Sequence, residues 1–231
     1  MVGLIGAMQL EMDQLMESME DRHETRIGSD CFYSGRLYGR EAVLAVCGPG
    51  KVNAALCAER MMLHYPVEWL LNLGVAGSGQ PGVGIGDMVI ATAAVQHDMD
   101  TTGLGDPPGF ISKIGLVELP CDAALREKLR QAAEKLGDVR VHEGLIATGD
   151  QFIHTAEARE RIHRQFGALA VEMEGAAVAH ACLTHGLPCG VLRSISDEAN
   201  GQADIDYPTF ARMAAAHTHR VIEILLKEMA S

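Results

Sequence analysis

The chain has 231 residues, of which 48% are hydrophobic and 22% charged, and its formal net charge is −12. This length can bury the core of one α/β domain, which we expect to span residues 1–231. The acidic balance argues against nucleic acid or an anionic membrane surface as the main partner. No window approaches the roughly 18 apolar residues of a membrane span. The first residues lack the basic start of a signal peptide, so we predict a cytoplasmic protein.

The six cysteines form no C-x-x-C pair and show no spacing typical of zinc ligands. Several lie in apolar runs, where a free thiol packs as a small hydrophobic group. We therefore interpret all six as reduced thiols of the core, which is typical of a reducing compartment.

Apolar runs and segments of helical periodicity alternate along the chain. In chain order we predict strands at residues 2–5, 32–38, 41–46, 69–73, 85–91, 141–148, 168–171 and 189–195. We predict helices that begin near residues 9, 51, 122, 155, 175 and 209, with Asp122 and Thr155 as caps of two of them. This alternation predicts a three-layer α/β/α sandwich around a mixed, largely parallel sheet.

Acidic residues follow the last two predicted strands. Glu172 and Glu174 come directly after the strand at residues 168–171, and Ser196 and Asp197 end the next one. An apolar strand has no structural need for an acid at its tip, and ligands bind at the carboxyl edge of such sheets. We therefore predict that two neighbouring strands deliver these carboxylates to a binding site.

Three other features carry little weight on their pattern alone. Glu11 falls in the first turn of a helix, where an acid commonly only complements the helix dipole. The Gly-rich turn at residues 47–55 could cradle a phosphate, but it lacks the Walker spacing, and a plain tight turn fits it equally well. His97, Asp98 and Asp100 lack a second cluster to complete a metal shell, so we predict no metal there and interpret residues 96–110 as a loop at a site rim or a subunit contact.

Five motifs occur in a fixed order along the chain. They are Gly6-Ala7-Met8-x-x-Glu11, Gly50-Lys51-Val52-Asn53-Ala54-Ala55, Thr148-Gly149-Asp150-x-Phe152-Ile153, Val171-Glu172-Met173-Glu174 and Arg193-x-Ile195-Ser196-Asp197. Together they resemble the bacterial 5′-methylthioadenosine/S-adenosylhomocysteine nucleosidases of the nucleoside phosphorylase superfamily, over essentially the whole chain. The resemblance implies a nucleoside phosphorylase-like fold and hydrolysis of the N-glycosidic bond of 5′-thio-substituted adenine nucleosides in methionine salvage. It implies no metal and no organic cofactor, and 5′-deoxyadenosine is a further candidate substrate.

The resemblance also implies a division of labour among the motif residues. Asp197 is expected to be the general acid toward N7 of the departing adenine, with Ser196 holding its carboxyl group, and Glu11 to orient the water that attacks C1′. Asp197 then needs a pKa raised by burial, unlike that of Glu11. Glu174 is expected to bind the ribose hydroxyls. For Glu172, ribose binding and a structural role stay equally open.

The remaining pocket residues that the resemblance implies are mostly apolar. Met173 is expected to form the floor under the sugar, Phe152 to stack on adenine, and the backbone of Ile153 to bond the purine edge. The further substrate-binding residues are Met8, Pro49, Val75, Leu104 and Tyr207.

Some of these positions depart from the better-known members of the family. Val75 replaces a serine hydroxyl, Tyr207 replaces phenylalanine, and Asp106 stands where an apolar or aromatic residue would surround the 5′-alkylthio group. The preferred 5′ substituent is therefore not fixed by the sequence. In the family a loop from a second subunit completes the pocket. Residues 96–110 are the candidate, which implies a homodimer.

Three rival functions stay open. A purine nucleoside phosphorylase needs an anion pocket, normally with arginines at the glycine turns, where this chain offers only Lys51. An aminodeoxyfutalosine hydrolase would differ only in the 5′ pocket. A catalytically silent nucleoside-binding homologue is disfavoured because Glu11, Glu174 and Asp197 are all present.

Overall fold

The structure, a computed structural model, describes residues 1–197 and 203–230, and for residues 203–209 the backbone alone. Its strands are β1 (Val2–Gly6), β2 (Met19–Ile27), β3 (Asp30–Leu37), β4 (Arg40–Val46), β5 (Trp69–Ser78), β6 (Met88–Gln96), β7 (Glu118–Pro120), β8 (Val141–Thr148), β9 (Ala170–Glu172) and β10 (Cys189–Asp197). Its helices are α1 (Gln9–Glu17), α2 (Lys51–His64), η1 (Thr102–Leu104), α3 (Ala123–Glu134), α4 (Ala156–Phe166), α5 (Gly175–His185) and α6 (Ala203–Ala230).

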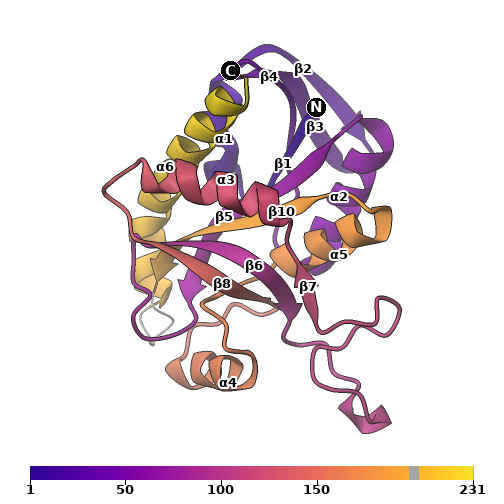
Figure 1. The fold of residues 1–231 in the computed structure, drawn as a ribbon, viewed down its shortest axis with the longest axis vertical. Helices are drawn as coiled ribbons and strands as arrows, with labels where there is room; N and C mark the ends of the chain where they lie inside the picture. Colours follow the sequence, from indigo (N-terminus) through magenta and orange to yellow (C-terminus); the bar gives the residue numbers. More distant parts are fainter. Residues whose placement is uncertain (198–202, 231) are drawn as a thin grey trace.

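The central strand of the mixed sheet is β5, which is buried along its whole length. It pairs in parallel with β1 and β10, and its last residues pair antiparallel with β9. Because β10 also pairs with β6, and β8 joins β6 to β9, these five strands close into a ring. Beyond β1, the strands β4, β3 and β2 extend the sheet outward from that ring (Figure 1).

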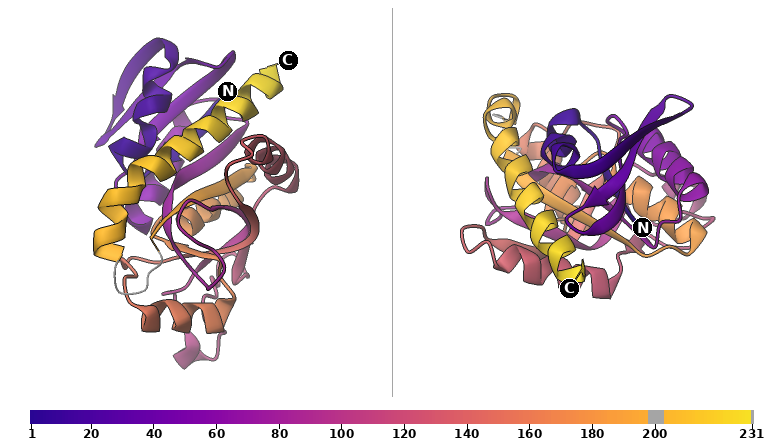
Figure 2. Two further views of the ribbon diagram at one scale, coloured as in Figure 1. Left: turned by 90° about the vertical axis from the view of Figure 1, so that its left-hand side faces the viewer. Right: turned by 90° about the horizontal axis from the view of Figure 1, so that it is seen from above.

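Helices cover both faces of the sheet. Leu4 and Leu71 pack into one core cluster with α1, α3 and α6, whereas their neighbours Ile5 and Leu70 pack into another with α2 and α5. Successive side chains of a strand point to opposite faces, so strands buried on both faces read as continuous apolar runs. Seen from above, α6 (yellow) lies on one side of the strands and α2 (violet) and α5 (orange) on the other (Figure 2). The predicted three-layer α/β/α fold is confirmed.

Helix α6 is 28 residues long. Even so, within residues 1–197 and 203–230 no helix combines the length and the apolar character needed to span a membrane.

Several predicted elements differ from the structure, among them β5, which continues to Ser78, and β6, which spans Met88–Gln96 instead of residues 85–91. The strand β2 was not predicted, because its side chains are almost all polar and exposed and show no apolar alternation. Among the described strands it pairs only with β3, and charged residues on such an edge discourage pairing with other chains. The last helix begins at Ala203 instead of residue 209. Proline is disfavoured inside helices, and Pro208 therefore pointed to a later start.

The prediction that the strands carrying Glu172 and Asp197 are neighbours is wrong. Strands β9 and β10 lie on opposite sides of β5, with Gly77 of β5 paired to both. Each strand ends in an acid as predicted, but sequence order does not reveal that a third strand separates them. The two acids nevertheless meet, because both strands end at the carboxyl edge of β5.

Candidate active site

A cavity of about 380 Å³ opens at the carboxyl ends of β1, β5, β9 and β10. The predicted site residues that line it are Met8, Glu11, Pro49, Val75, Phe152, Glu172, Met173, Glu174, Ser196 and Asp197. Segments that are far apart in the sequence thus converge on one hollow. The apolar members form most of its wall, and Phe152, half exposed, stands at the mouth.

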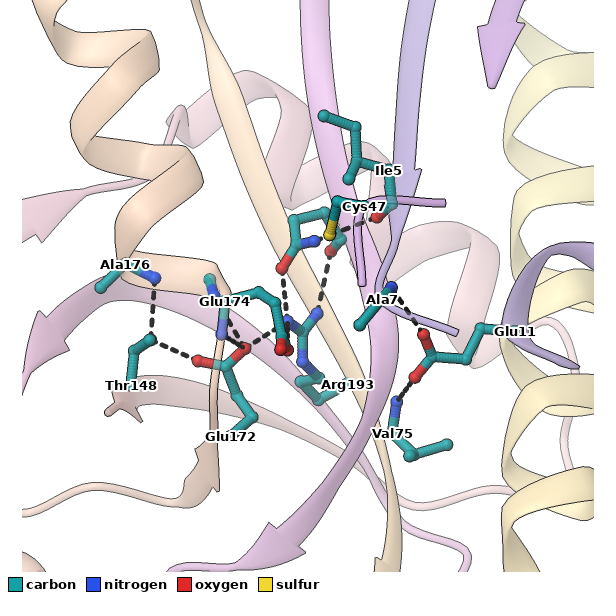
Figure 3. A network of polar contacts seen from close by, with 12 residues as sticks. Ile5, Ala7, Glu11, Cys47, Val75, Thr148, Glu172, Glu174, Ala176 and Arg193 are labelled. Atoms are coloured by element: carbon teal, nitrogen blue, oxygen red, sulfur yellow. Dashed lines mark hydrogen bonds and ion pairs between the residues drawn. The ribbon is translucent and has the colours of Figure 1, made fainter. Parts of the chain in front are cut away.

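Glu11 is held by backbone amides from two segments (Figure 3). Its Oε2 accepts hydrogen bonds from the N–H groups of Ala7 at 2.8 Å and Met8 at 2.9 Å, and its Oε1 accepts one from Val75 at 2.9 Å. Burial raises the pKa of Glu11, and these amides and the charge of Arg193 offset the effect only in part. The expectation that burial would not raise this pKa is therefore wrong, because desolvation outweighs three favourable hydrogen bonds.

A glycine makes room for this carboxylate. A Cβ atom on Gly74 would lie 2.6 Å from Oε1 of Glu11, closer than any real contact allows. Gly74 is a residue of β5. The structure shows that the group it admits is the side chain of Glu11.

Ser196 and Asp197 both face the cavity although they are consecutive residues of β10. The register of β10 against β5 shifts between Ile195 and Asp197, which marks a bulge. Bulges re-aim side chains that would otherwise alternate between faces. Ser196 Oγ donates to Asp197 Oδ2 at 3.1 Å and lies 3.4 Å from the carbonyl oxygen of Ala76.

Glu172 has four donors, which favour its structural interpretation. Its Oε1 accepts from the Thr148 hydroxyl, and its Oε2 accepts from the amides of Glu174 at 3.0 Å and Gly175 at 2.7 Å and from the guanidinium of Arg193. A carboxylate offers about four lone-pair sites. We infer that Glu172 anchors the start of α5 and leaves little acceptor capacity for a ligand.

Glu174 lies at the N-terminus of α5 and is buried. Its Oε1 accepts a hydrogen bond from the amide of Gly50 at 2.8 Å, and its Oε2 lies 4.0 Å from Arg193. Burial, and then the negative charge of Glu172, raise the pKa of Glu174 to about 7. Near neutral pH this group can therefore either accept or donate a hydrogen bond.

The sequence motif contained Arg193, but no role was predicted for it. Its side chain is 1% exposed and donates to the backbone and side chain of Asn72 and to Glu172. Burial lowers the pKa of Arg193, but the charges of Glu172, Glu174 and Glu11 raise it more. The available signal was an arginine inside an apolar strand, since a buried charge requires a partner.

Three predicted residues lie outside the described lining of the cavity. Ile153 is buried in a core cluster beside it. Leu104 is 85% exposed in η1, and the side chain of Tyr207 lies outside the described residues. The carboxylate of Asp106 accepts a hydrogen bond from the hydroxyl of Thr101 at 2.8 Å, within the same loop.

The acids considered as metal ligands have other contacts. Asp98 pairs with Lys51 at 2.7 Å, and Asp100 accepts from the amide and hydroxyl of Thr102. In the described part of the chain, no group of three or more His, Cys, Asp or Glu side chains is placed to hold a metal ion.

Comparison with known proteins gives consistent matches over the full length. The family model of the phosphorylase superfamily matches residues 1–227. The 5′-methylthioadenosine/S-adenosylhomocysteine nucleosidase of Anoxybacillus flavithermus is 36% identical over 233 residues, which cover 99% of this chain and 98% of that protein. The aminodeoxyfutalosine nucleosidase of Helicobacter pylori is 34% identical over 229 residues, 99% of each chain. The crystal structure of 5′-methylthioadenosine/S-adenosylhomocysteine nucleosidase from Neisseria meningitidis, in complex with methylthio-immucillin-A, has a TM-score of 0.95 at 35% identity, with 98% of both chains covered.

The raised pKa of Glu174 predicts a pH-dependent loss of stability. The folded state keeps a proton between pH 4.5, the ordinary pKa, and about 7, whereas the unfolded state releases it. The free energy of unfolding should therefore fall as pH rises through this window. Relative to Glu174→Gln, the wild type should lose on the order of 2 kcal/mol between pH 5 and pH 8 in urea unfolding. Glu157→Gln, at an exposed acid of α4, is the control, and parallel curves for wild type and Glu174→Gln would contradict the assignment.

Proposed function

Because the chain belongs to the phosphorylase superfamily, in the family of 5′-methylthioadenosine/S-adenosylhomocysteine nucleosidases, we propose that its cavity hydrolyses 5′-thio-substituted adenine nucleosides. The products are adenine and the 5-substituted ribose. We assign the activity to methionine salvage. We assign it to a single domain, which spans residues 1–231. The observation that carries the proposal is the convergence of Glu11 and Asp197, two buried acids from different elements, on one cavity.

The two acids suit the two halves of the reaction. Adenine leaves poorly unless it is protonated, and Asp197, steadied by Ser196, is the group we assign to N7. As the bond breaks, the ribose gains oxocarbenium character, which nearby carboxylates stabilise. The backbone amides take three of the four lone-pair sites of Glu11, and the site that remains can orient the attacking water. The raised pKa of Glu11 also makes it a stronger base.

The electrostatics of the cavity favour water over phosphate as the nucleophile. Its described lining contains Glu11, Glu172, Glu174 and Asp197 but no lysine, arginine or histidine. Arg193, which lies behind Glu172 and Glu174, is buried and already bonded to Glu172. A phosphate dianion would therefore meet carboxylates without a compensating donor set.

Two further properties belong to the proposal. We assign the protein to the cytoplasm, in keeping with its six free cysteines, of which all but the half-buried Cys31 are buried. We also assign it a homodimeric state, in which residues 96–110 of one subunit complete the 5′ pocket of the other. In support, these residues project from the body of the fold (Figure 1), and Leu104 of η1 within them is exposed. An apolar surface hollow between α2 and α5, lined by Val52, Leu56 and Ala181, offers a docking face.

Product analysis tests the reaction. With 5′-methylthioadenosine, the wild type should release adenine and free methylthioribose equally with and without phosphate. Asp197→Asn should lower turnover by about 100-fold or more, because the leaving adenine loses its proton donor. The midpoint of thermal unfolding should stay that of the wild type. Release that requires phosphate would identify a phosphorylase instead. Aminodeoxyfutalosine should be assayed as a second substrate. The aminodeoxyfutalosine nucleosidase of Helicobacter pylori is about as similar to this chain as a 5′-methylthioadenosine/S-adenosylhomocysteine nucleosidase.

The position of Glu11 can be tested through its neighbour. Gly74→Ala places a methyl group 2.6 Å from Glu11 Oε1 and must displace the carboxylate. Since a displacement of about 1 Å can cost 100-fold in rate, we expect a loss of roughly that size in kcat. Gly84→Ala is the matched control, because its Cβ meets no atom within 4 Å. Equal activity of the two variants would remove Glu11 from the mechanism.

The dimer can be tested on α2. Leu56→Glu places a charge in the hollow between α2 and α5 and should convert the assembly to a single chain of 24.8 kDa in sedimentation velocity, with a loss of activity. Leu63→Glu is the control. This residue is 64% exposed on the same helix but does not line the hollow. A wild type that sediments as a monomer would contradict the dimer.

A further inference from the structure

A lysine at the rim of the cavity joins three segments of the chain. Lys51 is the first residue of α2, and its Nζ lies 2.7 Å from Asp98 Oδ1 in the loop after β6. The same Nζ lies 4.0 Å from Asp150 Oδ2 in the loop after β8, and 3.4 Å from Gln96 Oε1. The Lys51 and Asp98 side chains are only 17% and 19% exposed, so solvent screens their ion pair less than a surface pair.

Backbone hydrogen bonds close these three residues into a ring. Asp98 Oδ2 accepts from the amide of Asp150 at 2.9 Å, and Asp150 Oδ1 accepts from the amide of Lys51 at 2.8 Å. Gly50, at the N-cap of α2, has no side chain to cap the helix, and Asp150 serves in its place. We call Lys51, Asp98 and Asp150 the rim clamp.

The rim clamp adjoins two groups of the proposed substrate site. Gly50, directly before Lys51, donates its amide to Glu174 Oε1 at 2.8 Å. Its φ of +99° favours glycine, and a Cβ there would lie 3.2 Å from Asp150 Oδ1. Phe152 follows Asp150 by two residues and lines the mouth of the cavity. A shift of the clamp would therefore move the amide that holds Glu174 and the loop that carries Phe152.

Lys51 is the one cation of the clamp and faces two carboxylates, those of Asp98 and Asp150. Burial raises the pKa of Asp98, but the hydrogen bonds from Lys51 and from the Asp150 amide lower it more, and the net shift is downward. Without Lys51, the carboxylates of Asp98 and Asp150 would face each other close to the acidic cavity. Repulsion would then open the rim.

We propose that Lys51 and Asp98 are positioning residues, which fix the Gly50 amide against Glu174 and hold the Phe152 loop over the base. The proposal rests on the proposed function, because it assigns the ribose to Glu174 and the adenine to Phe152. These contacts exist in both the bound substrate and the transition state. Their loss should therefore raise KM more than it lowers kcat.

A second ion pair on the same helix provides the matched control. Arg60 of α2 lies 2.6 Å from Asp30 of β3, and these side chains are 29% and 11% exposed. The pair ties the middle of α2 to the sheet, whereas the clamp ties the first residue of α2 to the loops that follow β6 and β8. If the clamp only stabilised the fold, the two pairs would respond alike.

Lys51 also lines the hollow between α2 and α5 that the proposed dimer uses. The test therefore compares Asp98→Asn and Lys51→Gln with Asp30→Asn and Arg60→Gln by steady-state kinetics on 5′-methylthioadenosine, by thermal unfolding and by sedimentation velocity, in which all variants should keep the wild-type assembly. We expect the clamp variants to raise KM about tenfold with a smaller change in kcat. The control pair should leave KM within about twofold at a similar change in thermal stability, and Lys51→Arg should recover most of the loss. Should Asp98→Asn not fold, Lys51→Gln and Lys51→Arg carry the same comparison.

The outcomes separate the two proposals. An active wild type whose clamp variants keep its KM, or change KM and thermal stability in step with the controls, overturns the positioning role and leaves the nucleosidase function in place. A wild type that releases no adenine overturns the proposed function and this role with it.

Discussion

The interaction on which the site depends is the buried ion pair between Arg193 and Glu172. Arg193 belongs to β10 and Glu172 to β9, and the guanidinium also bonds Asn72 of the strand between them. The same carboxylate holds the first amides of α5 and so fixes the start of the helix at Glu174. Because breaking a buried pair leaves an uncompensated charge and costs about 3–5 kcal/mol, these elements keep one arrangement.

Around the buried guanidinium of Arg193 the protein collects more acidic side chains than this one charge neutralises. Glu11 and Glu174 are buried nearby, and desolvation raises the pKa of both. The resulting field has one consistent consequence for the proposed chemistry. It opposes the entry of an anionic co-substrate, and it stabilises a sugar that becomes positively charged as its bond to adenine breaks. The raised pKa values of these acids and the proposed preference for hydrolysis over phosphorolysis therefore have the same origin.

The sequence predicted what is local and failed where pairing is non-local. Strands buried on both faces, such as β5, read as apolar runs, and the caps Asp122 and Thr155 were found because their signals lie within one helical turn. The exposed edge strand β2 carries no such signal. Long-range pairing places β5 between β9 and β10. The bulge that turns both Ser196 and Asp197 toward one cavity can be recognised only once the pairing of β10 with β5 is known. The role of Arg193 could not be predicted for the same reason, because its partners Asn72 and Glu172 lie on other strands.

The preference for a 5′ substituent is harder to predict than the chemistry, for a structural reason. Glu172 and Asp197 end strands, and Glu11 lies in the first turn of α1. Regular elements fix the backbone at all three positions, so short motifs are enough to locate these acids. In the proposed dimer the 5′ side of the pocket comes from a projecting segment whose Leu104 is 85% exposed within its own chain. Its contacts arise only on assembly, and no spacing within one chain encodes them. In that dimer, substitutions there, Asp106 among them, would change the substrate range while Glu11 and Asp197 keep their positions.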